Sequence, residues 1–399
     1  MKLWQKVTLG LIAGVIFGII AKENTKYVKP IGDIFINLIK MVVTPLVFFS
    51  LVSGITSMTD PSSLGRIGIK ASGAFILTTT FAIIIGLGIA LIMKPGVGVA
   101  LNLISDQEII VKEFNLGKFI TNIVPTSAIG ALAHGEMLQV VFFAIFTGIT
   151  LNALEEEGRV IVGYFQLMAK LVFKMIAIIM NLSPYGAFAL TSWLVGTQGI
   201  EVLQSLFKLV MAVIVAMLFQ YLVFGLLIWI FTRLSPIPFY RKSFEYQALA
   251  FSTSSSKATL ATTMKICRNK LGISNTSTSF VLPLGASINM DGMAIYLGMC
   301  AIFFAQATNT VLHSYDYFMI VLTATLGSIG AAGIPGGSMV MLPMVLSSVH
   351  IPIEGVALIA GIDRILDMLR TTVNITGDAT ITLIVDKSEG THDEKTYYS

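Results

Sequence analysis

The sequence predicts an all-α polytopic membrane protein, and three observations lead to this fold class. The 399 residues are 55% hydrophobic and only 12% charged, whereas charged residues make up about a quarter of an ordinary soluble domain. Long apolar runs recur along the chain, with lengths near the ~20 residues that span a bilayer as a helix. Two further apolar segments are interrupted at their centres by small polar residues or by Gly and Pro.

Eight apolar runs are candidates for transmembrane segments. They lie near residues 7–21, 31–58, 67–94, 118–153, 160–196, 202–232, 276–309 and 353–386. The first run follows a basic start, as in a signal peptide, but no A-x-A-like cleavage site comes after it. We therefore interpret it as the first transmembrane helix.

The two interrupted segments lie in the second half of the chain. The first reads AFSTSSSKATLATTMK (residues 250–265) and the second GSIGAAGIPGGSMVMLPMVL (residues 327–346). Each is too short to cross a membrane twice and has a turn at its centre, which indicates re-entrant hairpins within about 237–267 and 315–350. Non-helical backbone at membrane depth is tolerated only where protein or a water-filled cavity surrounds it.

A hairpin followed by a polar span occurs twice. Asn289 and Asp291 lie in the run after the first hairpin, and Asn374 and Asp378 lie in the run after the second. This pattern indicates an internal structural repeat, and paired interrupted segments in corresponding halves indicate the binding site of a transporter. A chance recurrence of Gly- and Ser-rich loops is the alternative.

A polar stripe marks the last apolar run, GIDRILDMLRTTVNITGDATITLIV. On a helix with roughly 100° per residue, six polar side chains fall within about 100° of one another. They are Asp363, Asp367, Arg370, Thr371, Asn374 and Asp378. Charges at membrane depth are costly unless they are paired or face water, so they indicate a functional site. A structural ion pair between helices is the alternative, and it stays open for Asp363 and Arg364.

The residue types in the stripe suggest an amino acid as ligand. Arg370 offers a planar fork for a carboxylate, and Asp367, one turn away, can pair with an ammonium group. A ligand with an additional carboxylate for Arg370 is an acidic amino acid. Backbone N–H groups and hydroxyls at Ser254, Ser255 and Ser256 can hold the α-carboxylate, as broken helix ends do.

A second set of polar residues suggests a cation. Asp291, Asp378, Asn289 and Asn374 supply hard oxygen ligands, which suit a small hard cation. The four His and two Cys residues have no metal-site spacing. No basic stripe with interleaved aromatic residues indicates nucleic-acid binding.

At these residues the chain resembles the dicarboxylate/amino acid:cation symporter family, which includes excitatory amino acid transporters and archaeal aspartate transporters. The matching stretches are STSSSKATL, LPLGASINMDG, SIGAAGIPGG and LDMLRTTVNITGD. Together with the spacing of the spans they cover essentially the whole chain. The resemblance implies eight transmembrane segments, two opposed re-entrant hairpins with inverted repeats, an elevator mechanism and a homotrimer in the cell inner membrane.

The resemblance also implies a division of the chain into two parts. Residues 1–58 and 118–196 resemble the trimerisation scaffold of the family, whereas residues 67–94 and 202–386 resemble its mobile transport domain. The second hairpin resembles the extracellular gate. Residues 387–399 form a polar C-terminal tail.

By position, the resemblance implies a substrate site in which Arg370 binds the side-chain carboxylate and Asp367 binds the amino group. The implied substrate-binding residues are Arg370, Asp367, Thr371, Asn374, Ser255, Ser256, Met293, Gly333, Ile334 and Gly336. The expected substrate is aspartate or glutamate, carried into the cell by symport with sodium.

The resemblance implies three sodium sites built from backbone and side-chain oxygens. The first comprises Gly285, Asn289, Asn374 and Asp378, and the second Thr78, Thr79, Asn289 and Asp291. The third involves backbone around Ser287, Ser328, Ile329 and Ala331, and Met290 is a further metal-site residue. No organic cofactor is expected, and the expected partners are sodium, the substrate, membrane lipids and further copies of the chain.

Some positions depart from the family pattern. Met293 replaces a Thr that helps to hold the substrate side-chain carboxylate, so a dicarboxylate or a neutral amino acid stays open as the substrate. Leu297 occupies the position of a protonatable Glu found in potassium-countertransporting members. Asp378 and the sequence SIG favour sodium, whereas proton-driven relatives tend to have Asn and Lys there. Lys257 beside the serines has no explanation in the pattern.

Two other functions compete with symport. An intramembrane aspartyl protease needs a G-x-G-D context, which neither Asp291 nor Asp378 has. We therefore expect no enzymatic activity. A passive channel is the second alternative, but a specific Arg–Asp pair favours a binding site over a pore.

Overall fold

The computed structural model describes residues 3–56, 65–98, 121, 123–199, 201–330, 336–353 and 356–399. Within these ranges the chain is all-helical and contains no strand. Five helical stretches among them are long and apolar enough to cross a membrane. The predicted all-α fold class is therefore confirmed.

Five of the expected runs form single helices. They are α1 (Leu3–Ala21), α2 (Lys29–Thr56), α3 (Gly65–Met93), α9 (Glu201–Thr232) and α16 (Val356–Ser388). A short 3-10 helix, η1 (Lys22–Tyr27), connects α1 to α2. These bounds agree closely with the runs read from the sequence.

Three other runs contain two helices each, although Asn275–Ala307 as a whole is long and apolar enough to cross a membrane. The pairs are α5 (Ala128–His134) and α6 (Met137–Ala153), α7 (Glu155–Asn181) and α8 (Ser183–Gln198), and α12 (Asn275–Ile288) and α13 (Asp291–Ala307). Gly135 ends α5 with φ +69°, a conformation that glycine adopts without steric cost. Pro184 lies in the first turn of α8, where its missing N–H is harmless.

Polar residues lie in the buried core at the break between α12 and α13. Asn289 ends α12 in an extended conformation, and its N–H donates to Gly285 O at 2.8 Å. Asp291 then begins α13, where a carboxylate interacts favourably with the positive end of the helix dipole. An interrupted helix at this depth therefore occurs in a span as well as in the hairpins.

A pair of helices lies in each of the two segments predicted as hairpins. The first hairpin consists of α10 (Pro236–Thr253) and α11 (Ser256–Asn269), and the second of α14 (Ser314–Gly330) and α15 (Gly337–Ser348). The turn of the first hairpin is formed by Ser254, which has φ +52°, and by Ser255, whose hydroxyl accepts the N–H of Ala258. Residues 331–335 of the second hairpin lie outside the described ranges.

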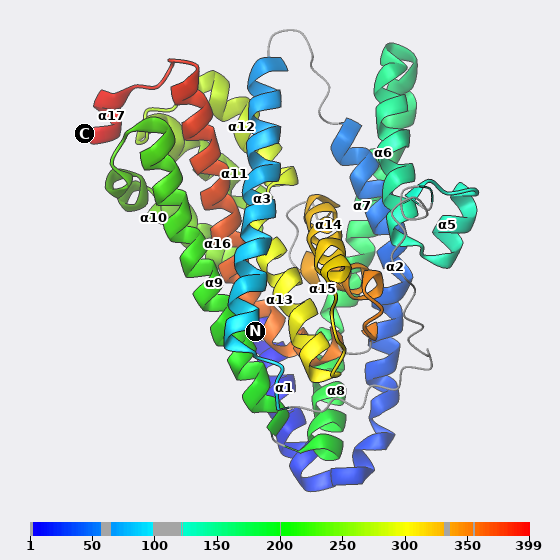
Figure 1. Cartoon of the computed structure of the whole chain (residues 1–399). Coiled ribbons are helices and arrows are strands. Elements are labelled where there is room, and N and C mark those ends of the chain that lie inside the picture. Colours follow the sequence, from blue (N-terminus) through cyan, green and yellow to red (C-terminus); the bar gives the residue numbers. More distant parts are fainter. Residues whose placement is uncertain are drawn as a thin grey trace.

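The helices pack in two groups (Figure 1). Helices α1, α2, α6, α7 and α8 pack mainly against one another, with α1 against α8 and α2 against α6 and α7. Helix α16 packs against α9, α10, α12 and α13, and α3 packs against α13. The second hairpin contacts both groups, because α15 touches α2 as well as α13 and α16.

The short helix α17 (Glu394–Tyr398) closes the base of the first hairpin, and we call residues 393–398 the C-terminal clasp. Tyr397 is fully buried, and its hydroxyl donates to Ser235 O at 2.8 Å. The Asp393 N–H donates to Gly272 O at 2.9 Å. Gly272 has φ +68°, and a Cβ there would collide with the Asp393 carbonyl oxygen.

Three backbone acceptors around one ammonium group complete the clasp. The ammonium group of Lys242 on α10 donates at 2.8–2.9 Å to three carbonyl oxygens, those of Lys270, Thr396 and Tyr397. Figure 1 shows α17 at the same end of the molecule as α10 and α12. The clasp therefore connects α10 and the end of α11 with α17, which is distant from both in sequence.

Candidate functional site

The polar stripe of α16 is buried. Arg370 is 1% exposed, Asp363 is 2% exposed and Asp367 is 6% exposed. Thr371 and Asn374 are also buried, and Asp378 is completely so. Buried charges are tolerated when they are paired and hydrogen-bonded, so the partners of these groups define what the site can do.

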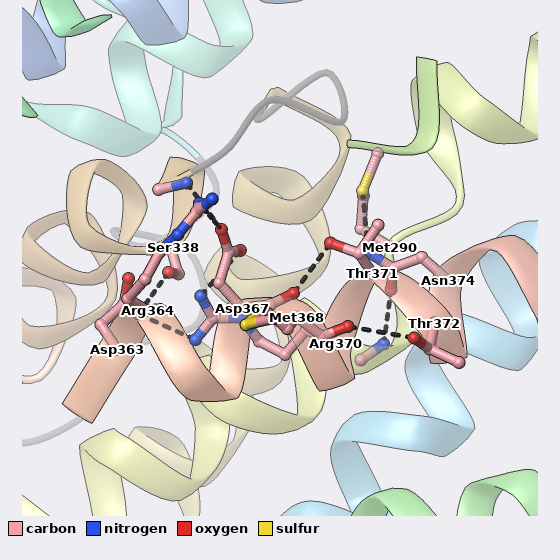
Figure 2. Close-up of polar contacts among 12 residues, drawn as sticks. Met290, Ser338, Asp363, Arg364, Asp367, Met368, Arg370, Thr371, Thr372 and Asn374 are labelled. Atoms are coloured by element: carbon pink, nitrogen blue, oxygen red, sulfur yellow. Dashed lines mark hydrogen bonds and ion pairs between the residues drawn. The ribbon is translucent and has the colours of Figure 1, made fainter. Parts of the chain in front are cut away.

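Arg370 is held by two carboxylates and an aromatic ring. Its Nη1 donates to Asp363 Oδ1 at 2.8 Å, and its Nη2 donates to Asp367 Oδ1 at 3.0 Å (Figure 2). The guanidinium carbon lies 4.2 Å from the centre of the Tyr296 ring, a cation–π geometry. The guanidinium is thereby fixed in one orientation beside the stripe.

The second hairpin contacts both of these carboxylates. The Gly336 N–H donates to Asp367 Oδ2 at 3.0 Å, and the Ser338 hydroxyl donates to Asp363 Oδ1 at 2.8 Å. Arg364 also donates to Asp367 Oδ2, at 3.3 Å. Figure 2 shows these groups converging on one side of α16. The start of α15 is therefore attached to the stripe by hydrogen bonds to charged acceptors.

The first hairpin brings buried hydroxyl groups to its turn. The hydroxyls of Ser254 and Ser256 are buried and have no hydrogen-bond partner among the described residues. Ser255 is engaged in capping α11, so its hydroxyl is used within the turn. Lys257 points elsewhere, with its ammonium 5.8 Å from the centre of the Phe173 ring on α7. Unpaired buried hydroxyls call for an explanation, and a polar ligand at the turn supplies one.

A first oxygen cluster surrounds Asp378. Its Oδ1 accepts Asn289 Nδ2 at 3.0 Å, whereas its Oδ2 is buried with no hydrogen-bond partner in the described ranges. Gly285 faces this carboxylate so closely that a Cβ there would lie 2.7 Å from Asp378 Oδ1. The free oxygen of a buried carboxylate is suited to bind a cation.

A second oxygen cluster surrounds Asp291. Thr79 Oγ1 lies 2.7 Å from Asp291 Oδ1 and 3.3 Å from Asn289 Oδ1, so three oxygens converge. Gln220 on α9 donates to Asp291 Oδ2 at 3.3 Å. Within the described ranges no group of three His, Cys, Asp or Glu residues converges. Amide and hydroxyl oxygens thus complete the cluster around Asp291, which suits a hard cation better than a soft transition metal.

Asn374 connects the stripe to the break between α12 and α13. Its Oδ1 accepts the Gly292 N–H at 2.8 Å, and its Nδ2 contacts the Met290 sulfur at 3.3 Å. Thr371 bonds within its own helix, to Asp367 O at 2.8 Å. Asn374 is therefore placed between the Arg370 region and the oxygen clusters.

Several predicted residues have no direct link to these groups. The hydroxyls of Ser287 and Ser328 bond to carbonyls of their own helices, and Met293 packs in the apolar core. Thr78, by contrast, contacts the Asp291 carboxylate as well as Phe75 O. Ile329 belongs to α14, and its side chain lies outside the described part of the molecule. Gly333, Ile334 and Ala331 are not among the described residues.

Sequence reasoning missed three residues of the site. Gln220 is the strongest case, because it is fully buried and its Oε1 has no hydrogen-bond partner in the described ranges. A side-chain amide at the centre of the apolar run 202–232 was the available signal. Ser338 and Tyr296 carry no comparable signal, since their importance follows from contacts with α16.

Comparisons with known proteins agree along the whole chain. A family model described as the sodium:dicarboxylate symporter family matches residues 3–388. The C4-dicarboxylate transport protein of Bacillus subtilis (strain 168) is 36% identical, with 99% of this chain and 96% of that protein aligned. The proton/sodium-glutamate symport protein of Geobacillus stearothermophilus is 38% identical, with 98% and 95% aligned. The C4-dicarboxylate transport protein of Rhizobium leguminosarum is 35% identical, with 97% and 89% aligned.

Proposed function

The chain belongs to the sodium:dicarboxylate symporter family, and on that premise we propose that it carries an acidic amino acid, aspartate or glutamate, into the cell together with sodium. The family resemblance read from the sequence is confirmed, as is the expectation of a transporter rather than an enzyme. The chain is an integral, multi-pass membrane protein.

The pairing of Arg370 with Asp367 is the observation that carries the proposal. The two groups lie 3.0 Å apart on one face of α16, so they present a carboxylate-binding fork beside an ammonium-binding carboxylate. The unpaired hydroxyls of Ser254 and Ser256 suit the α-carboxylate of the same ligand. An acidic amino acid matches all three features.

A C4-dicarboxylate is the second candidate substrate. Both oxygens of Asp367 already accept hydrogen bonds, from Arg370, Arg364 and the Gly336 N–H. With its charge compensated in this way, Asp367 has less need of a substrate ammonium group. Two of the three relatives described above are named as C4-dicarboxylate transport proteins.

Sodium is the proposed coupling ion, and the two oxygen clusters support it. Asp378 and Asp291 are buried carboxylates without a Lys or Arg partner among the described residues. A buried carboxylate needs either a cation or a proton, so proton coupling is the competing proposal. Asn289 serves both clusters, which would link the two ions to one another.

We propose that coupling runs through Asn289 and Asn374. Cations bound at the two clusters would order the break between α12 and α13, where Asn374 accepts the Gly292 N–H. That ordering completes the substrate site, and the second hairpin closes only over the fully loaded site. Partly loaded protein then moves poorly across the membrane, which enforces cotransport.

The proposed movement is an elevator motion within a homotrimer. The group around α16, residues 67–94 and 202–386, would move against the group formed by residues 1–58 and 118–196. The packing of α1 against α8 and of α2 against α6 and α7, with α16 against α9, α10, α12 and α13, supports that division. Exposed apolar side chains such as Ile69 and Leu222 suit contact with lipids or neighbouring copies.

Ligand binding to purified protein tests the proposal. Aspartate, glutamate, succinate and serine are titrated with and without sodium, and we expect sodium-dependent binding of aspartate or glutamate. Binding of succinate alone would select the C4-dicarboxylate. Binding that ignores sodium but strengthens at acid pH would overturn sodium coupling in favour of protons.

A further inference from the structure

Gln220 on α9 is a buried amide with one unused end. Its side chain is fully buried, its Nε2 donates to Asp291 Oδ2 at 3.3 Å, and its Oε1 has no hydrogen-bond partner among the described residues. Buried polar atoms are nearly always hydrogen-bonded, so an exception calls for an explanation. The explanation must supply a partner for a carbonyl oxygen that lies close to a buried carboxylate.

Two other glutamines show how an amide that only connects helices is satisfied. Gln306 on α13 accepts the Gly96 N–H at 3.0 Å through Oε1 and donates to Ala90 O at 3.4 Å through Nε2. Both ends of the Gln247 amide on α10 bond to hydroxyl groups, which belong to α9 and α16. A purely structural Gln220 should use both ends in the same way, and its unused oxygen sets it apart from these two residues.

The two oxygens of the Asp291 carboxylate have unequal contacts. Oδ1 accepts the Thr79 hydroxyl at 2.7 Å, whereas the contact of Oδ2 with Gln220 is longer, at 3.3 Å. Gly377 on α16 borders the same oxygen, since a Cβ at this position would lie 3.2 Å from Oδ2 and 2.8 Å from Asn289 Nδ2. The weakly bonded carboxylate oxygen and the unused amide oxygen therefore belong to one small region between α9, α13 and α16.

The chemistry of the amide suits a cation in this region. Rotation about the last side-chain bond of a glutamine has two broad minima, which exchange Oε1 and Nε2. Gln220 can therefore turn either a donor or an acceptor toward Asp291 Oδ2, and a cation at that oxygen would attract the acceptor. Amide and carboxylate oxygens together are the ligands that small hard cations prefer.

We propose that Gln220 is a ligand of the cation at the Asp291 cluster, so that its carbonyl oxygen brings α9 into the site. Thr79 on α3, Asn289 at the break and Asp291 on α13 supply the other oxygens. Ion binding then fixes α9 against α13. This inference deepens the proposed sodium coupling and rests on it. A structural Gln220 would instead hold the two helices together equally with and without the ion.

The test measures sodium binding without substrate, through the thermal unfolding midpoint of the purified protein in detergent. Sodium is titrated against choline at constant ionic strength, because an ion that binds the folded protein raises the midpoint according to its concentration relative to Kd. Gln220→Met keeps the length of the side chain but replaces the amide with a thioether, a poor ligand for a hard cation. We expect the sodium concentration needed for a given rise to increase by at least about threefold.

Gln306→Met is the matched control, because it removes an amide whose two ends already have partners. Its midpoint should fall in choline, and its sodium dependence should equal that of the unchanged protein. The same sodium dependence in Gln220→Met, whatever its midpoint in choline, would show a structural role and overturn the inference. If sodium does not stabilise the unchanged protein relative to choline, the proposed sodium coupling itself is refuted.

Gln220→Glu provides an independent decision if Gln220→Met cannot be purified. This variant keeps oxygens at the end of the side chain and removes the N–H donor that contacts Asp291. We expect the sodium concentration for a given rise of the midpoint to stay the same or to fall, because the cation keeps its oxygen ligand. An increase of threefold or more would show that the residue contributes its N–H donor and not its oxygen, and the inference would be wrong.

Discussion

The two hairpins are held in place by different kinds of contact. The turn of the first hairpin is capped by the Ser255 hydroxyl, and the base of this hairpin is bound to the C-terminal clasp. The second hairpin, at the start of α15, is attached through Gly336 and Ser338 to carboxylates of α16. The comparison teaches that the second hairpin depends on charged groups, those through which the proposed substrate would bind. Its position would therefore respond directly to a change of charge in the α16 stripe.

Arg370→Ala should have the largest effect on this comparison, because it removes the cation that pairs with Asp363 and Asp367, the two carboxylates that bind the second hairpin. Two buried carboxylates lose their partner, and breaking a buried pair costs about 3–5 kcal/mol. We expect affinity for the amino acid to fall by at least about 100-fold. Titration calorimetry at saturating sodium measures it, with Arg159→Ala on α7 as an exposed control. Unchanged affinity would show that the substrate binds elsewhere.

Tyr397→Ala should show that the first hairpin is fixed by packing rather than by ligand. Removing a fully buried aromatic side chain from the clasp should destabilise the protein by about 3 kcal/mol. The midpoint of thermal unfolding in detergent should fall, whereas substrate affinity at low temperature should not change. Tyr397→Phe, which keeps the ring and loses the hydroxyl that bonds to Ser235 and Phe239, should cost about 1 kcal/mol. A change in affinity without a change in stability would contradict the comparison.

Asp378→Asn should affect the second hairpin only indirectly, through weaker sodium binding. The variant therefore separates the effect of the ion from that of the direct contacts between α15 and α16. The variant removes the charge next to an unpaired oxygen, so the sodium concentration for half-maximal substrate binding should rise by about tenfold. A sodium titration of substrate binding measures this shift. Replacing sodium with choline should abolish the effect of the mutation, because neither protein then has its ion. A shift that appears instead in the pH dependence would favour protons.

Glu389→Gln should have the smallest effect, since it touches neither hairpin. Hydrogen bonds from Lys70 and Arg66 hold the pKa of Glu389 below its ordinary value of 4.5. A lowered pKa stabilises the protein above that ordinary value, and the contribution is lost as the pH falls through the folded-state pKa. The unfolding midpoint should therefore fall slightly at neutral pH and not at all in strong acid. High salt should remove the difference, because exposed pairs are screened.

The sequence predicted those features whose signals are local. The hairpins followed from breaks in apolar runs, and the stripe of Asp367, Arg370 and Asn374 followed from helical periodicity. The break after Asn289 was missed because the run remains apolar on both sides, and the turn is stabilised by contacts with α16. Gln220 was missed for the same reason, since its partner Asp291 lies 71 residues away in sequence.

The contacts of the C-terminal clasp can form only after the last residues of the chain have been synthesised. Ser235 and Tyr397 are 162 residues apart, so at about 5–20 residues per second the partner is synthesised roughly 8 to 30 seconds later. During that interval the carbonyl oxygen of Ser235 and the ammonium group of Lys242 lack their final partners. The base of the first hairpin is therefore among the last parts of the molecule to be completed, long after its turn has been inserted.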